Sequence, residues 1–461
     1  MTDQIAKPTR VASEAPAPID LRAREAEIQQ RVADILTEAK RQGASAAEVV
    51  ASEDLGLGVT VRMGELENVE FNQDRGFGIT VYRGQRRGSA STSDSRPEAI
   101  ADTVRAALNI ARYTQEDEYA GLADAELMPE QVADLALYHP WPLDADQARD
   151  LALACESAGL EHDARIVNSD GASVSSGQMC RVYGNSHGFV GGYLGTRHSV
   201  SCMLIAQDDN GMQRDYWYSV ARDAESLEEP ASVGRTAGER TVQRLSPRSV
   251  STGTMPVVFS PQMSMGLMGH VMGALSGGAV YKKASFLHDA LGQQALSSHI
   301  KIHEQPHLLG QLGSAAFDGE GVATWDKNFV AEGVIRSWMM SSYSARRLGL
   351  ATTGNAGGAH NLTLAGRTLP KQALLKEAGS GLYVTELMGQ GVNGVTGDYS
   401  RGASGFWFED GELQYPVDGV TIAGNLKSML LRIEAIGDDL DIRGNYRAPS
   451  VWIDAMTVAG A

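Results

Sequence analysis

The stretch GLGVTVRMGELENVEFNQDRGFGITVYRGQRRGSASTSD, residues 56–94, alternates apolar and polar side chains. Such alternation is typical of half-buried β-strands, and the Gly-containing breaks at 63–64, 74–76 and 83–84 are typical of the turns between strands. Apolar residues recur at helical spacing on both sides, over 21–40 and 97–113. Residues 21–113 are therefore predicted to form an N-terminal α+β domain with an antiparallel sheet and flanking helices.

The rest of the chain continues the α+β pattern. Residues 114–143 are acidic and carry turn residues, which predicts a linker. A helix over 144–160 and short strands over 165–223 predict a mainly β middle domain at 144–245. Residues 250–461 are Gly-rich and mixed, which predicts a large β-rich C-terminal domain with helices at 261–276, 370–378 and 425–436.

Charge and cysteine content exclude several function classes. The chain of 461 residues has 40 Lys and Arg against 57 Asp and Glu, a net charge of −17. Such a charge repels phosphate backbones and anionic lipids, so neither nucleic acid nor a membrane is expected as a partner. Residues 1–20 are polar and rich in Pro and Ala, which predicts a disordered arm and a cytoplasmic protein. The three cysteines form no C-x-x-C pair, so no disulfide framework is expected.

Two segments match catalytic motifs literally. HEQPH, 303–307, spells the zinc-peptidase pattern H-E-x-x-H, but Pro306 lacks the N–H that a continuing helix needs. GNSHG, 184–188, spells G-x-S-x-G, but the residues after it are strand-like rather than helical. We interpret the first as a strand leading into a loop and the second as a hairpin turn.

The segment 261–276 is the helix with the strongest local signals. Ser260 can cap it, Pro261 suits its first turn, and an apolar stripe includes Val271 and Leu275. His270 lies on the edge of this stripe. A single imidazole in that position is more often a packed, hydrogen-bonded core histidine than a metal ligand.

Several blocks in order resemble one family, the TldD/PmbA family of bacterial peptidase subunits. The blocks are DRGFG (74–78), SSYSARRLG (341–349), GNAGGAHN (354–361), TELMGQG (385–391), GDYSRG (397–402), PV (416–417) and TIAGNL (421–426). The resemblance covers the chain from about residue 36 to its end. It implies a cytoplasmic heterodimer of two related subunits, TldD and PmbA (also called TldE), that degrades or trims unfolded peptides with one zinc ion.

The chain departs from the zinc-bearing subunit of that family at the metal site. That subunit carries H-E-x-x-x-H on the helix that matches 261–276, and a cysteine ligand near its C-terminus. Here His270 matches the first histidine, but Val271 replaces the glutamate, Leu275 replaces the second histidine, and no cysteine follows Cys202. A catalytic zinc needs about three protein ligands and a base. The chain therefore resembles the PmbA (TldE) subunit, with no metal site or catalytic residue of its own, a vestigial ligand position at His270, and zinc expected in the partner.

Three functions follow as hypotheses. The first is the metal-free subunit of a two-subunit metallopeptidase, which holds the substrate as an extended strand. Its candidate peptide-binding residues lie in Gly-rich segments: Gly357, Gly358, His360, Gly389, Gln390 and Gly391. The second is a metallopeptidase active alone, with His270 or the 303–307 histidines. The third is a homodimeric peptide-binding protein with no catalytic partner.

Overall fold

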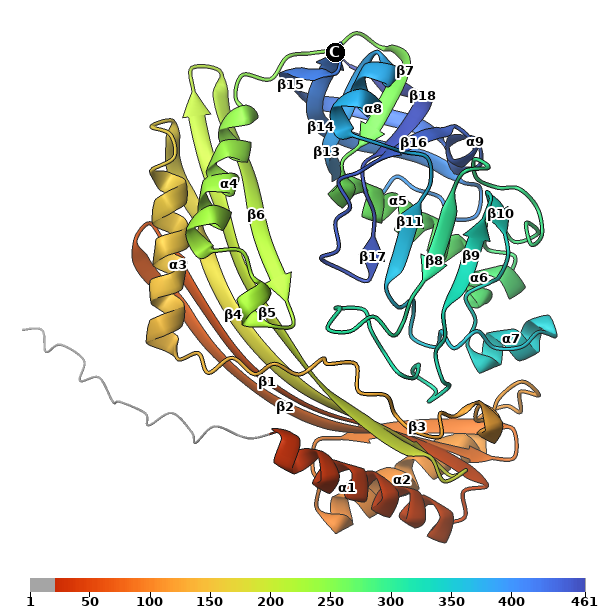
Figure 1. Ribbon diagram of the computed structural model, residues 1–461. Coiled ribbons are helices and arrows are strands. Elements are labelled where there is room, and N and C mark those ends of the chain that lie inside the picture. Colours follow the sequence, from red (N-terminus) through yellow and green to blue (C-terminus); the bar gives the residue numbers. More distant parts are fainter. Residues whose placement is uncertain (1–20, 461) are drawn as a thin grey trace, which may run out of the picture.

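A long, curved, six-stranded sheet organises the molecule (Figure 1). The computed structural model describes residues 21–460, and in them the sheet has the order β3-β2-β1-β4-β5-β6 with antiparallel neighbours. Helices lie on its convex side and the C-terminal half of the chain lies on its concave side (Figure 1). The elements of this part are α1 (Leu21–Arg41), β1 (Ala46–Arg62), β2 (Glu65–Arg83), β3 (Arg86–Thr92), α2 (Pro97–Tyr113), η1 (Ala125–Leu127), α3 (Ala145–Leu160), β4 (Ile166–Asn185), β5 (Val190–Asp208), β6 (Gly211–Ala221), η2 (Ala224–Ser226) and α4 (Pro230–Gln243).

Side-chain alternation along β1 explains how the sheet is covered. Val49 belongs to a buried cluster beneath α1 and α2, and Val59 belongs to a second cluster beneath α3 and α4. Both side chains project to the convex face because successive strand residues alternate between faces. Glu48 and Asp54 therefore project to the concave face. The alternation that predicted a half-buried strand is the alternation that separates the core from this concave surface.

The pairing of β1 with β4 joins the N-terminal and middle segments into one sheet. The predicted linker at 114–143 thus crosses between two halves of a single sheet. The predicted turn at 74–76 is wrong, because β2 continues through it and pairs with β1 at Glu53–Arg75 and Asp54–Asp74. The sequence reading also missed α4, although Pro230 begins it and Val233, Ala237 and Thr241 are buried at helical spacing.

The C-terminal part contains two sheets around one large core. Strand β7 pairs with both β13 and β18, which closes part of the seven-stranded sheet into a barrel, and a five-stranded sheet lies beside it. The predicted helix at 425–436 is too long, since α9 ends at Leu431 and a strand follows. The elements are β7 (Gly253–Phe259), α5 (Pro261–Ala274), α6 (Gly277–Tyr281), β8 (Lys301–Glu304), β9 (Lys327–Ala331), β10 (Val334–Ile335), α7 (Ser342–Leu348), β11 (Leu362–Ala365), β12 (Thr368–Leu369), α8 (Lys371–Ala378), β13 (Ser380–Met388), β14 (Asp398–Glu409), β15 (Glu412–Asn425), α9 (Leu426–Leu431), β16 (Ile433–Gly437), β17 (Tyr446–Arg447) and β18 (Val451–Ala459).

Three arginines hold the C-terminal part against the sheet and the linker. Arg222 is buried and donates to the carbonyls of Thr196, Gln311 and Leu312. Arg346 donates to linker carbonyls between residues 119 and 122. Arg443 donates to the carbonyl of Tyr218 on β6 at 2.7 Å. Because each arginine bonds to main-chain oxygens, the two parts of the molecule are fixed relative to each other.

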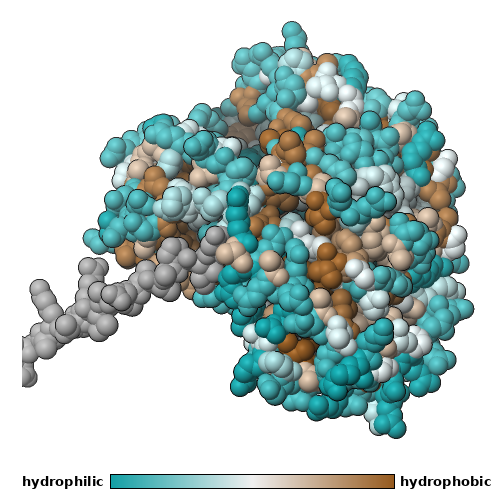
Figure 2. Space-filling model, turned by 60° about the horizontal axis from the view of Figure 1, so that its bottom comes forward, coloured by the Kyte–Doolittle hydropathy of each residue, from teal (hydrophilic) through white to brown (hydrophobic). Residues whose placement is uncertain are grey.

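The described residues confirm the predicted α+β class, with an N-terminal antiparallel sheet and a β-rich C-terminal part. The predicted arm at 1–20 lies outside them. Among residues 21–460, no helix combines the length and the apolar character that a membrane crossing requires. Viewed from its lower side, the molecule is mostly hydrophilic, with hydrophobic side chains gathered in patches toward the centre of the view (Figure 2).

Candidate functional site

The vestigial ligand position lies on α5, where the sequence predicted a helix. His270 is half-buried, and its ring meets the ring of Tyr399 edge-on at 6.1 Å between centroids. Burial, together with the positive charge of Arg401, lowers the pKa of His270. The ring is packed as expected, but its nitrogens make no hydrogen bond to residues 21–460, so that part of the expectation is wrong. Ser260 precedes the helix as expected, but its side chain makes no capping hydrogen bond.

The neighbours of His270 on α5 do not fit a metal. Val271 is 1% exposed, Leu275, which directly follows the last residue of α5, is fully buried, and both belong to the large C-terminal core. The three cysteines lie far from α5 in the chain and are all buried, Cys155 on α3, Cys180 on β4 and Cys202 on β5. No group of three or more His, Cys, Asp or Glu side chains that could hold a metal occurs within residues 21–460. The donor set around α5 thus falls short of the three ligands that a catalytic zinc requires.

A cavity of about 220 Å³ opens beside His270, and Gln390, Val392 and Arg401 line it with the imidazole. Gly389 has a positive φ of 77°, and nothing lies near the position of its missing side chain. Gly391 has a different constraint, because a Cβ there would lie 1.9 Å from the carbonyl oxygen of Ser400. The structure therefore brings the predicted segment 389–391 to the vestigial ligand position.

The other predicted group, Gly357, Gly358 and His360, lies on a segment that the glutamate of HEQPH holds through the His360 backbone N–H and through Asn355. Glu304 is fully buried and accepts from Lys327 Nζ at 2.6 Å, from Asn355 Nδ2 at 2.9 Å and from the His360 backbone N–H at 2.7 Å. Burial lowers the pKa of His360 to about 4. With its oxygens already bonded, Glu304 anchors the Gly-rich segment and is not placed to act as a catalytic base.

The short edge strand β17 lies between the two predicted groups, the segment 389–391 beside His270 and the segment 357–360. On one side, the ring of Tyr446 lies 3.9 Å from where a Cβ on Gly269 would stand. On the other side, Leu362 donates to the carbonyl of Asn445 at 2.7 Å, and the Asn445 amide donates to the carbonyl of Ala359. The predicted peptide-binding residues thus flank one strand at the edge of the five-stranded sheet.

Both literal motif matches have the local structure predicted for them. His303 lies on β8 and bonds to Asn328, while His307 follows the strand and bonds to Thr324. The two imidazoles therefore do not share a helix face. The GNSHG segment ends β4 and turns into β5, where the Ser186 hydroxyl accepts from the Ala47 backbone N–H at 3.0 Å. Neither arrangement presents a nucleophile or a pair of metal ligands.

The sequence reading missed the groove between the concave face of the sheet and the C-terminal part. One cavity of about 840 Å³ lies among β1, β2, the linker and α7. In it, Glu48 accepts from the hydroxyls of Tyr82 and Tyr183 at 3.1 Å each, and burial raises the pKa of Glu48. A second cavity of about 490 Å³ includes Asp54, which pairs with Arg181. The available signal was that Glu48 and Asp54 are six residues apart, an even number, so both project to the same face of β1.

Comparison with protein families covers almost all of the described chain. Models described as PmbA/TldA metallopeptidase domain 1, central domain and C-terminal domain match residues 47–111, 138–245 and 252–460. These matches follow the chain order of the sheet halves and the C-terminal part.

Curated relatives and solved structures agree with these matches. The chain is 50% identical to Metalloprotease PmbA of Escherichia coli O157:H7, over 90% of this chain and 92% of that protein. It is 46% identical to the Metalloprotease PmbA homolog of Haemophilus influenzae, over 95% and 98%. A crystal structure titled as a putative modulator of DNA gyrase from Bacteroides thetaiotaomicron superposes with a TM-score of 0.89 at 26% identity, over 94% and 99%. TldE from Thermococcus kodakarensis shares the fold, with a TM-score of 0.81 at 18% identity over 93% and 100%.

Proposed function

The chain belongs to the PmbA/TldD metallopeptidase family, and we propose that it is the PmbA/TldE-like subunit of a cytoplasmic two-subunit peptidase whose zinc lies in a TldD-like partner. In this proposal the chain has no catalytic residue of its own. It holds unfolded peptide substrates in an extended conformation near the partner's zinc. The reaction is the hydrolysis of peptide bonds in short or unfolded chains.

One observation carries the proposal: on α5, a single histidine faces a cavity while the two neighbouring ligand positions are filled by core residues. Val271 and Leu275 contribute to packing and can neither ligate zinc nor activate water. The chain keeps the family's domains, and residues 21–460 contain no group of three or more side chains that could hold a metal. A subunit of this kind needs a partner that brings the zinc and the base.

The relatives support the choice of partner. Haemophilus influenzae has both a Metalloprotease PmbA homolog, 46% identical to this chain, and a Metalloprotease TldD homolog, 21% identical over 86% of this chain. A genome with both types can supply both halves of a heterodimer. An extended substrate fits the exposed Gly-rich segments, since Gly357 and Gly389 leave open space where a side chain would stand.

Zinc content tests the proposal directly. The chain purified alone, without a polyhistidine tag, is expected to contain close to zero zinc per molecule by elemental mass spectrometry. Peptidase activity is expected to appear only after mixing with the TldD-like paralogue, and a chelator should abolish it. The proposal would be contradicted by a content close to one zinc per chain that decreases in the variant His270→Ala or His303→Ala.

Gln390→Ala tests the cavity beside His270. The amide of Gln390 can bond a peptide backbone, so its loss is expected to raise the KM of the reconstituted pair about three- to tenfold with little change in kcat. Gln414→Ala, an exposed glutamine on β15, is the matched control. Gly391→Val is less informative, because its side chain would collide with Ser400 whatever the loop binds. An unchanged KM for Gln390→Ala would remove this loop from the site.

A further inference from the structure

Part of strand β5 lies at the edge of the sheet without a partner strand. On one side β5 pairs with β4 along almost its whole length. On the other side it pairs with β6 only over residues 198–208. Residues 190–197 therefore present an open edge, which is unusual because natural proteins generally cover or blunt such edges.

The groups on this edge can be identified from one contact. The Thr196 backbone N–H donates outward to the carbonyl of Leu137 at 2.9 Å. Strand residues alternate between the two edges, so Val190, Gly192 and Leu194 also direct their N–H and C=O groups outward. No hydrogen bond to a residue within 21–460 engages these six groups. These three alternate residues are thus available for pairing with another strand.

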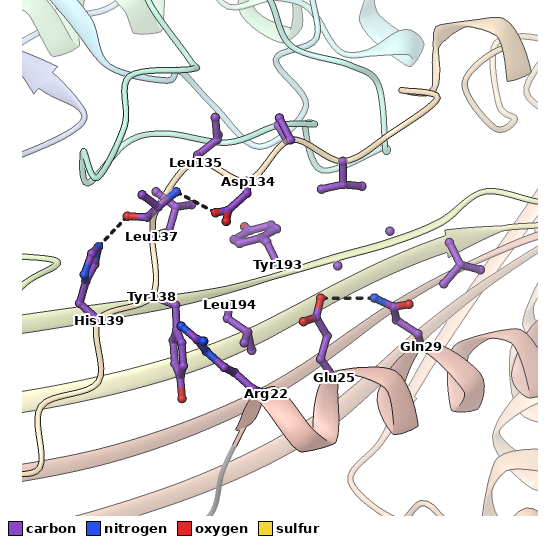
Figure 3. A pocket seen from close by; sticks show the side chains of 17 residues that line it. Arg22, Glu25, Gln29, Asp134, Leu135, Leu137, Tyr138, His139, Tyr193 and Leu194 are labelled. Atoms are coloured by element: carbon purple, nitrogen blue, oxygen red, sulfur yellow. Dashed lines mark hydrogen bonds between the residues drawn. The ribbon is translucent and has the colours of Figure 1, made fainter.

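A cavity of about 790 Å³ borders this open edge. Figure 3 shows its walls: Glu25 and Gln29 project from α1 on one side, Asp134 and Leu135 from the linker on the other, and Tyr193 from β5 between them. At one end the linker meets β5 through the Leu137 to Thr196 bond, and beyond that point the two segments separate. The cavity is the slot that this separation leaves.

We propose that this slot binds an extended peptide, which adds as a strand to the outer edge of β5 at residues 190–194. Alternating backbone donors and acceptors are matched by another extended backbone, so the free groups themselves define the chemistry of the ligand. The inference rests on the proposed function, because an unfolded peptide is the substrate class of that reaction. It adds a holding site on the sheet, outside the cavity of His270.

The walls of the slot also define the side chains that suit it. A strand added to β5 would direct alternate side chains toward α1 and toward the linker. Glu25 and Asp134 give the slot two carboxylates, whereas the Arg22 guanidinium stacks on the ring of Tyr138 at 5.1 Å. On the linker side, Leu135 is buried and Tyr193 is partly buried in one apolar cluster. The preferred segment therefore carries a Lys or Arg toward Glu25 on the α1 side, and apolar residues with one Lys or Arg beside Asp134 on the linker side.

The test uses a fluorescein-labelled octapeptide of alternating Val and Thr with a Lys at each end, titrated into the full-length chain. Leu194→Pro removes one outward N–H and is expected to weaken binding about tenfold or more, since proline is tolerated on strand edges but cannot donate. Leu194→Ala removes the same side chain but keeps the N–H, so it is the reference against which the tenfold loss in Leu194→Pro is measured. Glu25→Lys should also weaken binding of this basic peptide.

A second measurement avoids substitutions in the protein. The same peptide, N-methylated at its central amides, cannot pair on either edge and is expected not to bind. Bound unmethylated peptide should slow amide hydrogen exchange across residues 190–197. Equal binding of the methylated peptide, or no change in exchange there, would overturn the proposal.

The remaining outcomes are equally decisive. If peptide binds only after residues 1–20 are removed, the occupant of the slot is this chain's own N-terminal segment and the proposal is wrong. These measurements need neither zinc nor a partner. Binding that persists when no paralogue restores peptidase activity would therefore refute the proposed function and leave the slot in place.

Discussion

Replacing Lys327 with methionine is expected to lower the free energy of unfolding by about 3–5 kcal/mol, because it leaves a buried carboxylate without its counter-charge. The ammonium of Lys327 lies 2.6 Å from Glu304, and the two side chains are 9% and 0% exposed. Two neutral donors, the amide of Asn355 and the backbone N–H of His360, would remain. Neither carries a charge that can offset the cost of burying an anion.

The pH dependence of this loss has a definite sign. Burial raises the pKa of Glu304 and the charge of Lys327 opposes that rise, so the pKa climbs further in Lys327→Met. A carboxyl whose pKa is higher in the folded state stabilises the fold while it is protonated, and this stabilisation is lost as pH rises through the folded value. The difference from the unchanged protein should therefore be largest at neutral pH and above, and should shrink as the pH falls into the acid range.

Urea unfolding at pH 7.5 and pH 5.5 measures both effects. Lys301→Met is the matched control, because Lys301 is exposed on the neighbouring strand β8. Combining Lys327→Met with Glu304→Gln removes the buried charge and should recover part of the lost stability. A loss below about 1 kcal/mol, or one that does not vary with pH, would show that the pair is solvated rather than buried.

The Glu304 network also bears on function, because it fixes the Gly-rich segment 357–360. Glu304 holds Asn355 and the His360 backbone, and Asn355 in turn donates to the carbonyl of Gly358 at 3.1 Å. A motif that resembles a zinc peptidase in sequence is thus an anchor for a candidate substrate-binding loop. Lys327→Met should lower peptide cleavage by the reconstituted pair even at temperatures where the variant stays folded.

Local signals predicted the elements that depend on local chemistry. Pro97 and the apolar spacing after it placed α2 correctly over Pro97–Tyr113, and Pro261 placed the start of α5. Met63 and Gly64, both with positive φ, form the turn that the sequence predicted between β1 and β2. In each case one or two residues decide the backbone conformation.

Long-range contacts decided what the sequence could not. Gly76 suggested a turn, but opposite Ser52 in a long antiparallel pair it continues the strand without strain. The union of the two sheet halves depends on β1 pairing with β4, more than a hundred residues away. The same holds for His270, whose cavity is completed by Gln390 and Arg401 from other elements. Spacing on one helix could not reveal that its polar edge faces a space built by distant segments.

Restoring H-E-x-x-x-H on α5 by Val271→Glu with Leu275→His is expected to give neither zinc binding nor peptidase activity. The two replaced side chains are 1% and 0% exposed within the C-terminal core, so the new glutamate would be buried without a partner. Such a charge, together with the lost packing, should cost about 3–5 kcal/mol or more and lower the midpoint of unfolding sharply.

The apolar pair Val271→Leu with Leu275→Met separates disturbed packing from buried charge. It should cost about 1–3 kcal/mol at Val271, where leucine adds a methylene to a packed core, and less than about 1.5 kcal/mol at Leu275. His270→Ala should have a small effect on stability, because the ring is half-buried and makes no hydrogen bond to residues 21–460. The contrary result would be a restored motif that folds as stably as the unchanged chain and holds close to one zinc. In that case α5 could bind zinc as soon as the ligand side chains were present. Because Val271 and Leu275 are built into the core that holds α5 against the barrel, we expect the opposite: the two substitutions disrupt the packing of α5 before they can build a metal site.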